Sequence, residues 1–189
     1  MPRKYELKRR AESQDETRRR IVEATVALHA DVGPARTTIS AIAERAGVQR
    51  LTVYRHFPDE RSLLGACSAH WLAADPPPEP AAWAAILDVD ERCRTALTEL
   101  YGWYRREQAM IANVDRDAPT WPALAEIADR EPFVAAAVGA LARSRGRRKR
   151  VRAALGHAVE FSTWRSLCVG QGLSEAEAAA VMATFVASV

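Results

Sequence analysis

The segment ISAIAERAGVQRLTVYRHF (39–57) restricts the possible fold more than any other part of the sequence. Ala43 is small enough for two helices to cross closely, and Gly47 allows the positive φ of a tight turn between them. The residues that would fill the wedge between those helices are all aliphatic: Ile42, Ala46, Val48 and Val53. Val53 and Phe57 lie four residues apart, so one face would anchor the second helix. This spacing predicts a helix-turn-helix.

The remaining faces of that second helix carry hydrogen-bonding side chains. Thr52, Tyr54, Arg55 and His56 would be displayed around a thin apolar anchor. The major groove of DNA presents a donor and acceptor code on its base edges, and it accommodates one α-helix. The pattern therefore favours a helix that reads double-stranded DNA over an ordinary surface helix.

The rest of the chain has helical periodicity interrupted by Pro and Gly, and no alternating strand pattern persists. We expect a first helix from a capping box at Ser13 to the Gly33-Pro34 break, and a last one from a capping box at Ser174. The other expected helices begin at Thr38, within 47–57, at Asp59 and at Asp88, and cover 123–144 and 147–169. The predicted class is all-α, with about nine helices, three of them short and near the front.

Composition excludes several classes of protein. The 189 residues are 48% hydrophobic and 27% charged, and no apolar run is long enough to cross a membrane. Cys67, Cys93 and Cys168 are far apart without metal-ligand spacing, which indicates reduced core cysteines and neither zinc nor disulfides. We expect no cofactor. The basic start lacks the apolar stretch of a secretory signal, so we expect a cytoplasmic protein. No catalytic motif such as HExxH, a P-loop or a nucleophile elbow is present, so we do not expect an enzyme.

Positive charge is concentrated in the N-terminal third. Residues 1–65 hold 13 Lys and Arg against 9 Asp and Glu, whereas residues 66–189 hold 14 against 15. A basic head on a nearly neutral body suits a polyanion-binding protein. Two clusters remain open: the residues near the start could form a minor-groove arm or a solvated tail, and RSRGRRKRVR (143–152) could bind an anion or be a solvated loop.

Residues 21–64 closely resemble the DNA-binding head of the TetR (tetracycline-repressor) family of bacterial regulators. The resemblance is carried by ATVALHADVG, RTTISAIAERAGV, TVYRHF and PDERSLL, and its most specific part is Tyr54 followed by His56-Phe57. The segment HAVEFSTWRSLCVGQGLSEAEA also looks like the helix pair that ends many members. The resemblance implies a basic arm (1–12), a helix-turn-helix DNA-binding domain (13–57) and a helical ligand-binding and dimerisation domain (58–189).

The same resemblance implies a ligand-responsive transcriptional regulator, expected to be a repressor, that binds a palindromic operator as a homodimer. A small-molecule effector entering the larger domain would change the separation of the two heads. Thr38 and Tyr54 would bind phosphates, while Gln49, Arg50 and Thr52 would lie nearest the bases. The full set of expected DNA-binding residues is Arg36, Thr38, Ser40, Gln49, Arg50, Thr52, Tyr54, His56 and Arg61. Arg50 is the best candidate for base reading, because a guanidinium can bind guanine O6 and N7 bidentately.

Three positions depart from the family pattern. Gln49 stands where a capping Ser is common, and Leu51 stands where a small residue or Pro is common. Leu51 could disturb the fit to DNA or contact a thymine methyl group. Glu60 replaces a frequent phosphate-binding Lys, for which Arg61 could substitute. These departures leave open a family-derived module that binds small molecules or proteins but no specific DNA.

Candidates for the effector site and the dimer interface lie further along the chain. Residues that could line a pocket for a hydrophobic or aromatic effector, or simply form the core, are Leu100, Tyr104, Trp121, Phe133, His157, Phe161 and Trp164. Two apolar stripes could pack against a second copy or within one subunit; they contain Val151, Leu155, Val159, Val181, Met182 and Phe185.

Overall fold

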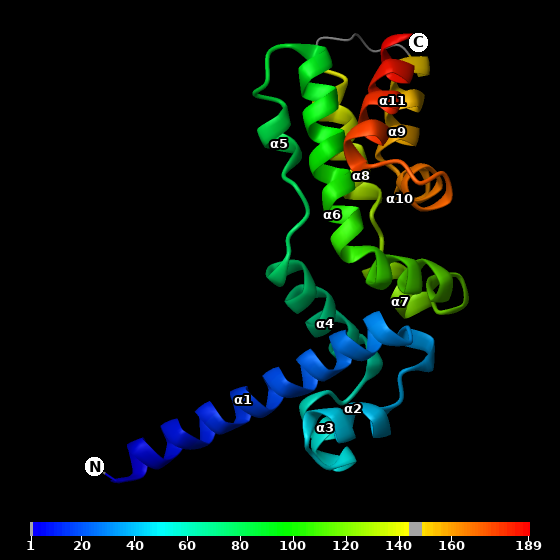
Figure 1. The fold of residues 1–189 in the computed structure, drawn as a ribbon. Helices are drawn as coiled ribbons and strands as arrows, with labels where there is room; N and C mark the ends of the chain where they lie inside the picture. Colours follow the sequence, from blue (N-terminus) through cyan, green and yellow to red (C-terminus); the bar gives the residue numbers. More distant parts are fainter. Residues whose placement is uncertain (1, 144–148) are drawn as a thin grey trace. The chain divides into compact units, whose positions relative to one another are not determined.

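The computed structural model describes residues 2–143 and 149–189, with the side chains of residues 2–11 left out of the description. The described residues form helices and no strands (Figure 1), which confirms the predicted all-α class. In chain order the elements are α1 (Pro2–Asp31), η1 (Pro34–Arg36), α2 (Ile39–Ala46), α3 (Arg50–His56), α4 (Glu60–Ala74), α5 (Pro80–Trp83), α6 (Val89–Asp117), η2 (Ala118–Thr120), α7 (Pro122–Ile127), α8 (Glu131–Leu141), α9 (Lys149–Val159), α10 (Phe161–Trp164), η3 (Arg165–Gly170) and α11 (Glu175–Ala187).

The chain divides into two compact units. The first, here called the head unit, contains residues 1–76 and 109–128; the second, the body unit, contains residues 77–108 and 129–189. Helix α6 contributes its end to the head unit and its beginning to the body unit. None of the described helices is long and apolar enough to cross a lipid bilayer.

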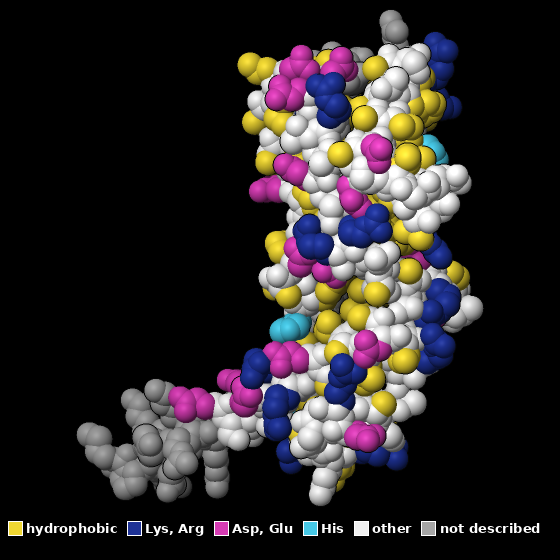
Figure 2. Space-filling model, viewed as in Figure 1, with side chains coloured by type: hydrophobic (Ala, Val, Ile, Leu, Met, Phe, Trp, Pro, Cys, Tyr) yellow, Lys and Arg dark blue, Asp and Glu magenta, His cyan; other side chains and the backbone are white. Residues whose placement is uncertain are grey.

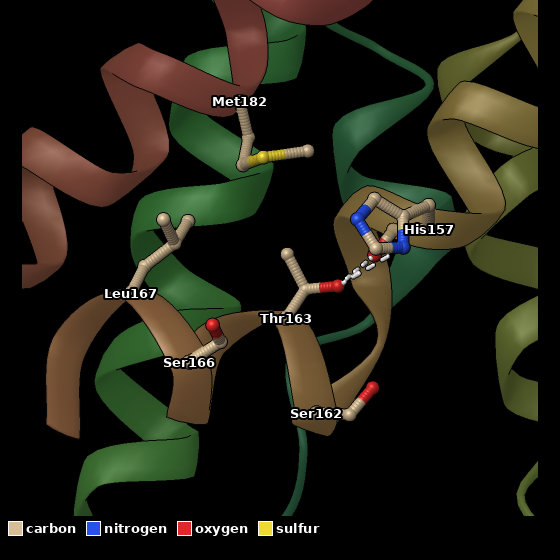
Figure 3. A pocket seen from close by; sticks show the side chains of 6 residues that line it. All are labelled: His157, Ser162, Thr163, Ser166, Leu167 and Met182. Carbon is tan, nitrogen blue, oxygen red and sulfur yellow. Dashed lines mark hydrogen bonds between the residues drawn. The ribbon is translucent and has the colours of Figure 1, made fainter. Parts of the chain in front are cut away.

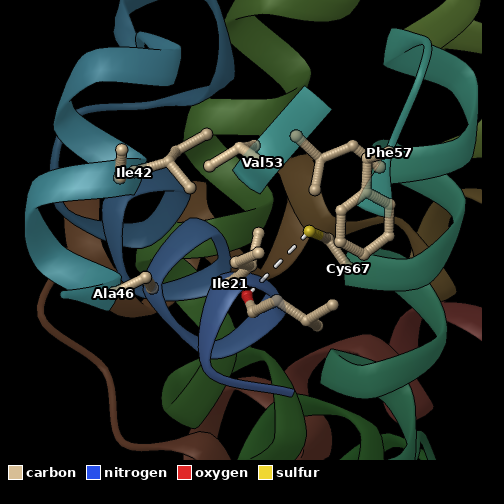
Figure 4. Close-up of a cluster of buried hydrophobic side chains, with 10 residues drawn as sticks. Ile21, Ile42, Ala46, Val53, Phe57 and Cys67 are labelled. Carbon is tan, nitrogen blue, oxygen red and sulfur yellow. Dashed lines mark hydrogen bonds between the residues drawn. The ribbon is translucent and has the colours of Figure 1, made fainter. Parts of the chain in front are cut away.

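The head unit is built around one aliphatic cluster. Helix α1 packs against α2 and α4, and α2 packs against α3. The side chains that meet between them, shown in Figure 4, include Ile21, Ile42, Ala46, Val53, Phe57 and Cys67. Val53 is fully buried, so the wedge expected between α2 and α3 is present. Because α3 has only seven residues, this packing rather than its own propensity must keep it helical.

Local capping determines where the head helices begin and end. The Thr38 hydroxyl accepts the Ala41 N–H at 3.1 Å, and Gly47 ends α2 in the left-handed conformation (φ 65°, ψ 40°). The Asp59 carboxylate accepts the Ser62 N–H at 2.7 Å and begins α4. The Gln49 side chain makes no capping bond to α3, as expected for a departure from Ser. All four features confirm the predictions from the sequence.

Three predicted helix boundaries were wrong. Helix α1 begins at Pro2 rather than Ser13, because Lys, Arg, Glu and Leu before Ser13 are themselves good helix formers. The helix expected over 123–144 is divided into α7 and α8, where Pro132 lies in the first turn of α8 and cannot donate to a continuing helix. The helix expected over 147–169 is interrupted at Glu160 (φ −72°, ψ 140°).

Buried hydroxyl groups account for that last interruption. The Tyr101 and Tyr104 hydroxyls donate to the carbonyl oxygens of Ala158 and Val159, each at 2.7 Å. The Thr163 hydroxyl donates to the carbonyl of His157 at 2.6 Å. These carbonyls would otherwise accept the backbone N–H groups of the next helical turn, so α9 ends and α10 starts anew.

The body unit buries aromatic side chains between α6 and the C-terminal helices. Its largest fully buried residues are Trp83, Leu97, Leu100, Tyr101, Tyr104, Leu141, Leu155, Val159 and Trp164. Ser174 and Glu177 form the predicted capping box at the start of α11, with the Ser174 N–H donating to Glu177 at 2.9 Å. This unit therefore has its own buried aromatic and aliphatic core.

Candidate functional site

Helix α3 has one buried side and one exposed side. Val53 is 0% exposed and Phe57 3%, whereas Leu51 is 75% exposed and Tyr54 47%. The other residues expected to contact DNA from this helix are also accessible, with Gln49 and Arg50 exposed and Thr52 and His56 half-buried. The polar side of α3 is thus free to enter a groove, while the opposite side anchors it to the head unit.

Three further residues expected to contact DNA lie just before α2 or in its first turn. Arg36, Thr38 and Ser40 are all exposed. The Arg36 Nε donates to the carbonyl of Val32 at 2.7 Å, which holds the guanidinium near the α1–α2 connection. Thr38 uses its oxygen as an acceptor for the cap, so its O–H remains available as a donor to a phosphate oxygen. Basic, acidic and hydrophobic side chains all reach the surface of the head unit in Figure 2.

Arg18 on α1 supports the end of α3, a role that the sequence did not reveal. Its guanidinium lies 4.1 Å from the centre of the Phe57 ring, and its Nη1 donates to the carbonyl of His56 at 2.9 Å. Burial, together with the positive charges of Arg55 and Arg18, lowers the pKa of His56. The imidazole of this last residue of α3 is therefore neutral at neutral pH.

Arg61 is engaged by a partner within the head unit. Its two terminal nitrogens donate to the two carboxylate oxygens of Glu126 on α7, each at 2.7 Å. Both side chains are more than half exposed, so solvent screens the pair. The guanidinium that would substitute for the family's phosphate-binding Lys thus already binds an anionic group, and Glu126 is a second residue that the sequence did not reveal.

The α1–α2 connection is fastened to the end of α6. The Asn113 amide donates to the carbonyls of His29 and Ala30 at 3.0 and 2.8 Å, and the Asp117 carboxylate accepts the Ala35 N–H at 2.9 Å. Burial raises the pKa of Asp117, but hydrogen bonds from Arg116 and Ala35 outweigh it, and the net shift is downward. The Asp117 carboxylate consequently stays ionised while it accepts the Ala35 N–H of the α1–α2 connection.

Three of the predicted effector residues meet in one aromatic cluster in the body unit. The ring of Tyr104 lies 5.3 Å from that of Phe161 and 6.0 Å from that of Trp164, and Phe161 and Trp164 are 5.2 Å apart. Leu100 is also fully buried. The Trp164 indole N–H is buried with no hydrogen-bond partner, an unusual state for a buried donor. The cluster is closely packed, with one unsatisfied polar group.

His157 lies instead beside a separate cavity. This cavity of about 170 Å³ is shown in Figure 3 and is lined by His157, Ser162, Thr163, Ser166, Leu167 and Met182. Three hydroxyl groups, an imidazole and two apolar side chains give it mixed polarity. The two remaining candidates are elsewhere: Phe133 is half-buried on α8, and Trp121 is half-buried in the head unit.

The predicted dimer residues separate into two groups. Val151, Leu155 and Val159 on α9 and Met182 on α11 are buried within the body unit. Val181 and Phe185 on α11 are 49% and 45% exposed. Only α11 therefore presents large apolar side chains of this set to solvent. Residues 144–148 of the basic run, and the side chains of the basic start, lie outside the described residues.

Comparison with known proteins gives a consistent result for the head. Residues 21–67 match the sequence model of the family described as bacterial regulatory proteins, tetR family. An uncharacterized HTH-type transcriptional regulator of Mycobacterium bovis is 44% identical over 55 residues, and one of Mycobacterium tuberculosis is 45% identical over 54 residues. Each match covers 29% of this chain and 29% of the relative, so the likeness spans less than a third of those proteins.

Solved structures extend the comparison to more than nine-tenths of the chain. A Mesorhizobium loti protein described as a TetR-family transcriptional regulator has a TM-score of 0.66 at 18% identity, covering 93% of this chain and 95% of that one. The TetR-like regulator LfrR of Mycobacterium smegmatis, in complex with proflavine, has a TM-score of 0.54 at 21% identity, covering 93% and 97%. At these identities the likeness shows a shared fold.

Proposed function

We propose that this chain is a bacterial transcriptional regulator of the TetR family, which binds a palindromic operator as a homodimer and represses transcription until a small molecule binds the body unit. The observation that carries the proposal is the division of α3, in which Val53 and Phe57 are buried while the polar residues around them remain accessible. The proposed role is regulatory and cytoplasmic, with no catalysis.

Recognition of DNA would combine two kinds of contact. Thr38 and Tyr54 would bind phosphates, which supply affinity without sequence information. Arg50, exposed in the first turn of α3, would read guanine through a bidentate contact. Such a contact is worth about 1–3 kcal/mol of discrimination against another base.

A second copy would place another α3 on the next turn of the same face of DNA. Helix-turn-helix dimers read half-sites whose centres are about 34–36 Å apart. The exposed Val181 and Phe185 of α11 are the centre of the proposed interface, with α9 of each copy beside them. Val151, Leu155 and Val159 would then stabilise α9 from inside the body unit rather than touch the partner.

The effector would be a hydrophobic or aromatic molecule that carries a hydrogen-bond acceptor. The aromatic cluster of Tyr104, Phe161 and Trp164 offers stacking surfaces, and the unpaired Trp164 N–H offers a donor. LfrR, which shares the fold, was crystallised with the aromatic compound proflavine. Sites for drug-sized ligands usually occupy about 300–1,000 Å³. Because this aromatic cluster is closely packed, the proposed effector would have to displace some of its side chains.

Selection of operator sequences from random DNA tests the proposal, followed by binding assays with two variants. Arg50→Ala should lose affinity for the selected operator but keep its affinity for random DNA. Arg36→Ala should weaken both complexes and reduce the dependence of affinity on salt concentration. Equal losses of Arg50→Ala on both DNAs would refute the assignment of base reading to Arg50.

A second candidate function is a family-derived module that binds small molecules or proteins but no specific DNA. The observation that favours it is the bidentate pairing of Arg61 with Glu126, next to Glu60 in place of a basic residue. In that case, selection from random DNA would yield no enriched sequence, although small molecules would still raise the thermal stability of the protein.

A further inference from the structure

Helix α3 has weak support of its own at both ends. It has seven residues, and its N-cap residue Gln49 makes no side-chain bond to it. At its C-terminal end, Phe57 closes the helix with a backbone bond to Val53, and the carbonyl of His56 is among those that have no partner within the helix. A helix this short depends on outside contacts for its position.

Arg18 supplies such a contact from α1, 38 residues earlier in the chain. The Nη1 donates to the His56 carbonyl at 2.9 Å, and the guanidinium carbon Cζ lies 4.1 Å from the Phe57 ring centre. The first contact satisfies a carbonyl at the negative end of the α3 dipole, where a cation is favourable. The second covers the aromatic ring whose burial anchors the helix.

We propose that Arg18 is a positioning residue for DNA recognition: it clamps the C-terminal end of α3 and so fixes the direction in which the polar side of that helix points. This inference rests on the proposed function. A small rotation of α3 about its Val53 anchor would move the side chains of Arg50 and Thr52 relative to the bases. Phosphate contacts tolerate such a rotation better, because they are fewer on α3 and less directional.

Loss of a positioning residue and loss of a direct phosphate ligand would change DNA affinity in different ways. A lost phosphate contact weakens binding to all DNA and reduces the slope of log affinity against log salt by about 0.9. A lost clamp weakens binding to the operator alone and leaves the slope unchanged. One charge-assisted hydrogen bond and one cation–π contact together correspond to about a tenfold effect on an equilibrium.

The test compares Arg18→Ala, Arg18→Lys and the matched control Arg19→Ala. Arg19 lies on the same helix and loses the same charge, but it pairs with Glu16 and Glu23 instead of α3. We expect Arg18→Ala to bind the selected operator about tenfold more weakly than Arg19→Ala, with equal affinities for random DNA and equal salt slopes. Arg18→Lys should restore little, because an ammonium group lacks the planar surface that covers Phe57.

Hydrogen exchange provides a readout that requires no operator. Amide exchange over residues 50–57 should be about tenfold faster in Arg18→Ala than in Arg19→Ala, while exchange in α2 stays the same. Equal exchange in α3, or parallel losses on operator and random DNA with a smaller salt slope, would overturn the positioning role. If selection enriches no operator but α3 exchange still accelerates, the proposed function fails while the clamp itself is supported.

Discussion

Acidification from pH 7 to pH 5 should destabilise the head unit through His29. The imidazole is 7% exposed in the last turn of α1, and burial lowers its pKa from 6.5 to about 4 despite the opposing charge of Asp117. Between these two values the unfolded chain binds a proton that the folded head excludes. Stability is therefore complete above about pH 6.5 and declines as the pH falls towards 4.

The expected size of the effect follows from that shift. A full shift of this size corresponds to about 3 kcal/mol, of which about 2 kcal/mol should be lost between pH 7 and pH 5, before most carboxylates titrate. Urea unfolding at both pH values, followed by circular dichroism, measures the difference in the free energy of unfolding. His29→Leu, which keeps an apolar side chain of similar size, should remove most of the pH dependence.

The control is His157→Gln, at an exposed position of the body unit. The free energy of unfolding of this variant should equal that of the unsubstituted protein at both pH values. If His29→Leu lost as much stability on acidification as the unsubstituted protein, the burial of His29 would not be the cause. The reasoning would also be refuted if the unsubstituted protein were equally stable at pH 7 and pH 5.

Three further predictions concern the head unit. Gly33→Ala should destabilise it by about 2–3 kcal/mol in urea unfolding, because Gly33 has φ 94° and a Cβ there would collide with the Arg116 guanidinium; an unchanged midpoint would contradict this. Glu126→Gln should free Arg61 and tighten binding to operator and random DNA alike with a steeper salt dependence, whereas unchanged slopes would show that Arg61 does not reach DNA. Replacing operator thymines singly by uracil should weaken binding about fourfold at the position that Leu51 contacts, and a Leu51→Ala variant should not sense the change; equal binding at every position would assign Leu51 no methyl contact.

The features that the sequence by itself determined are those set by neighbours within about one helical turn. The Thr38, Asp59 and Ser174 caps, the left-handed Gly47 and the buried Val53 could all be predicted, because each depends on side chains one to four positions away. The helix-turn-helix itself belongs to this group. The aliphatic residues between α2 and α3 are close together in the sequence, so few other arrangements of two helices would bury them.

The tertiary structure alone decided the contacts that orient these elements. Arg18 meets His56 and Phe57, Arg61 meets Glu126, and Asp117 meets Ala35, across 38 to 82 positions of the chain. No local pattern marks any of these partners. The end of α9 was missed for the same reason: tyrosine hydroxyls from α6 take the carbonyls that would have continued it. Hydrophobic periodicity shows which side of a helix is buried. The hydrogen-bond partner of a polar side chain, however, depends on which distant segments pack against that helix.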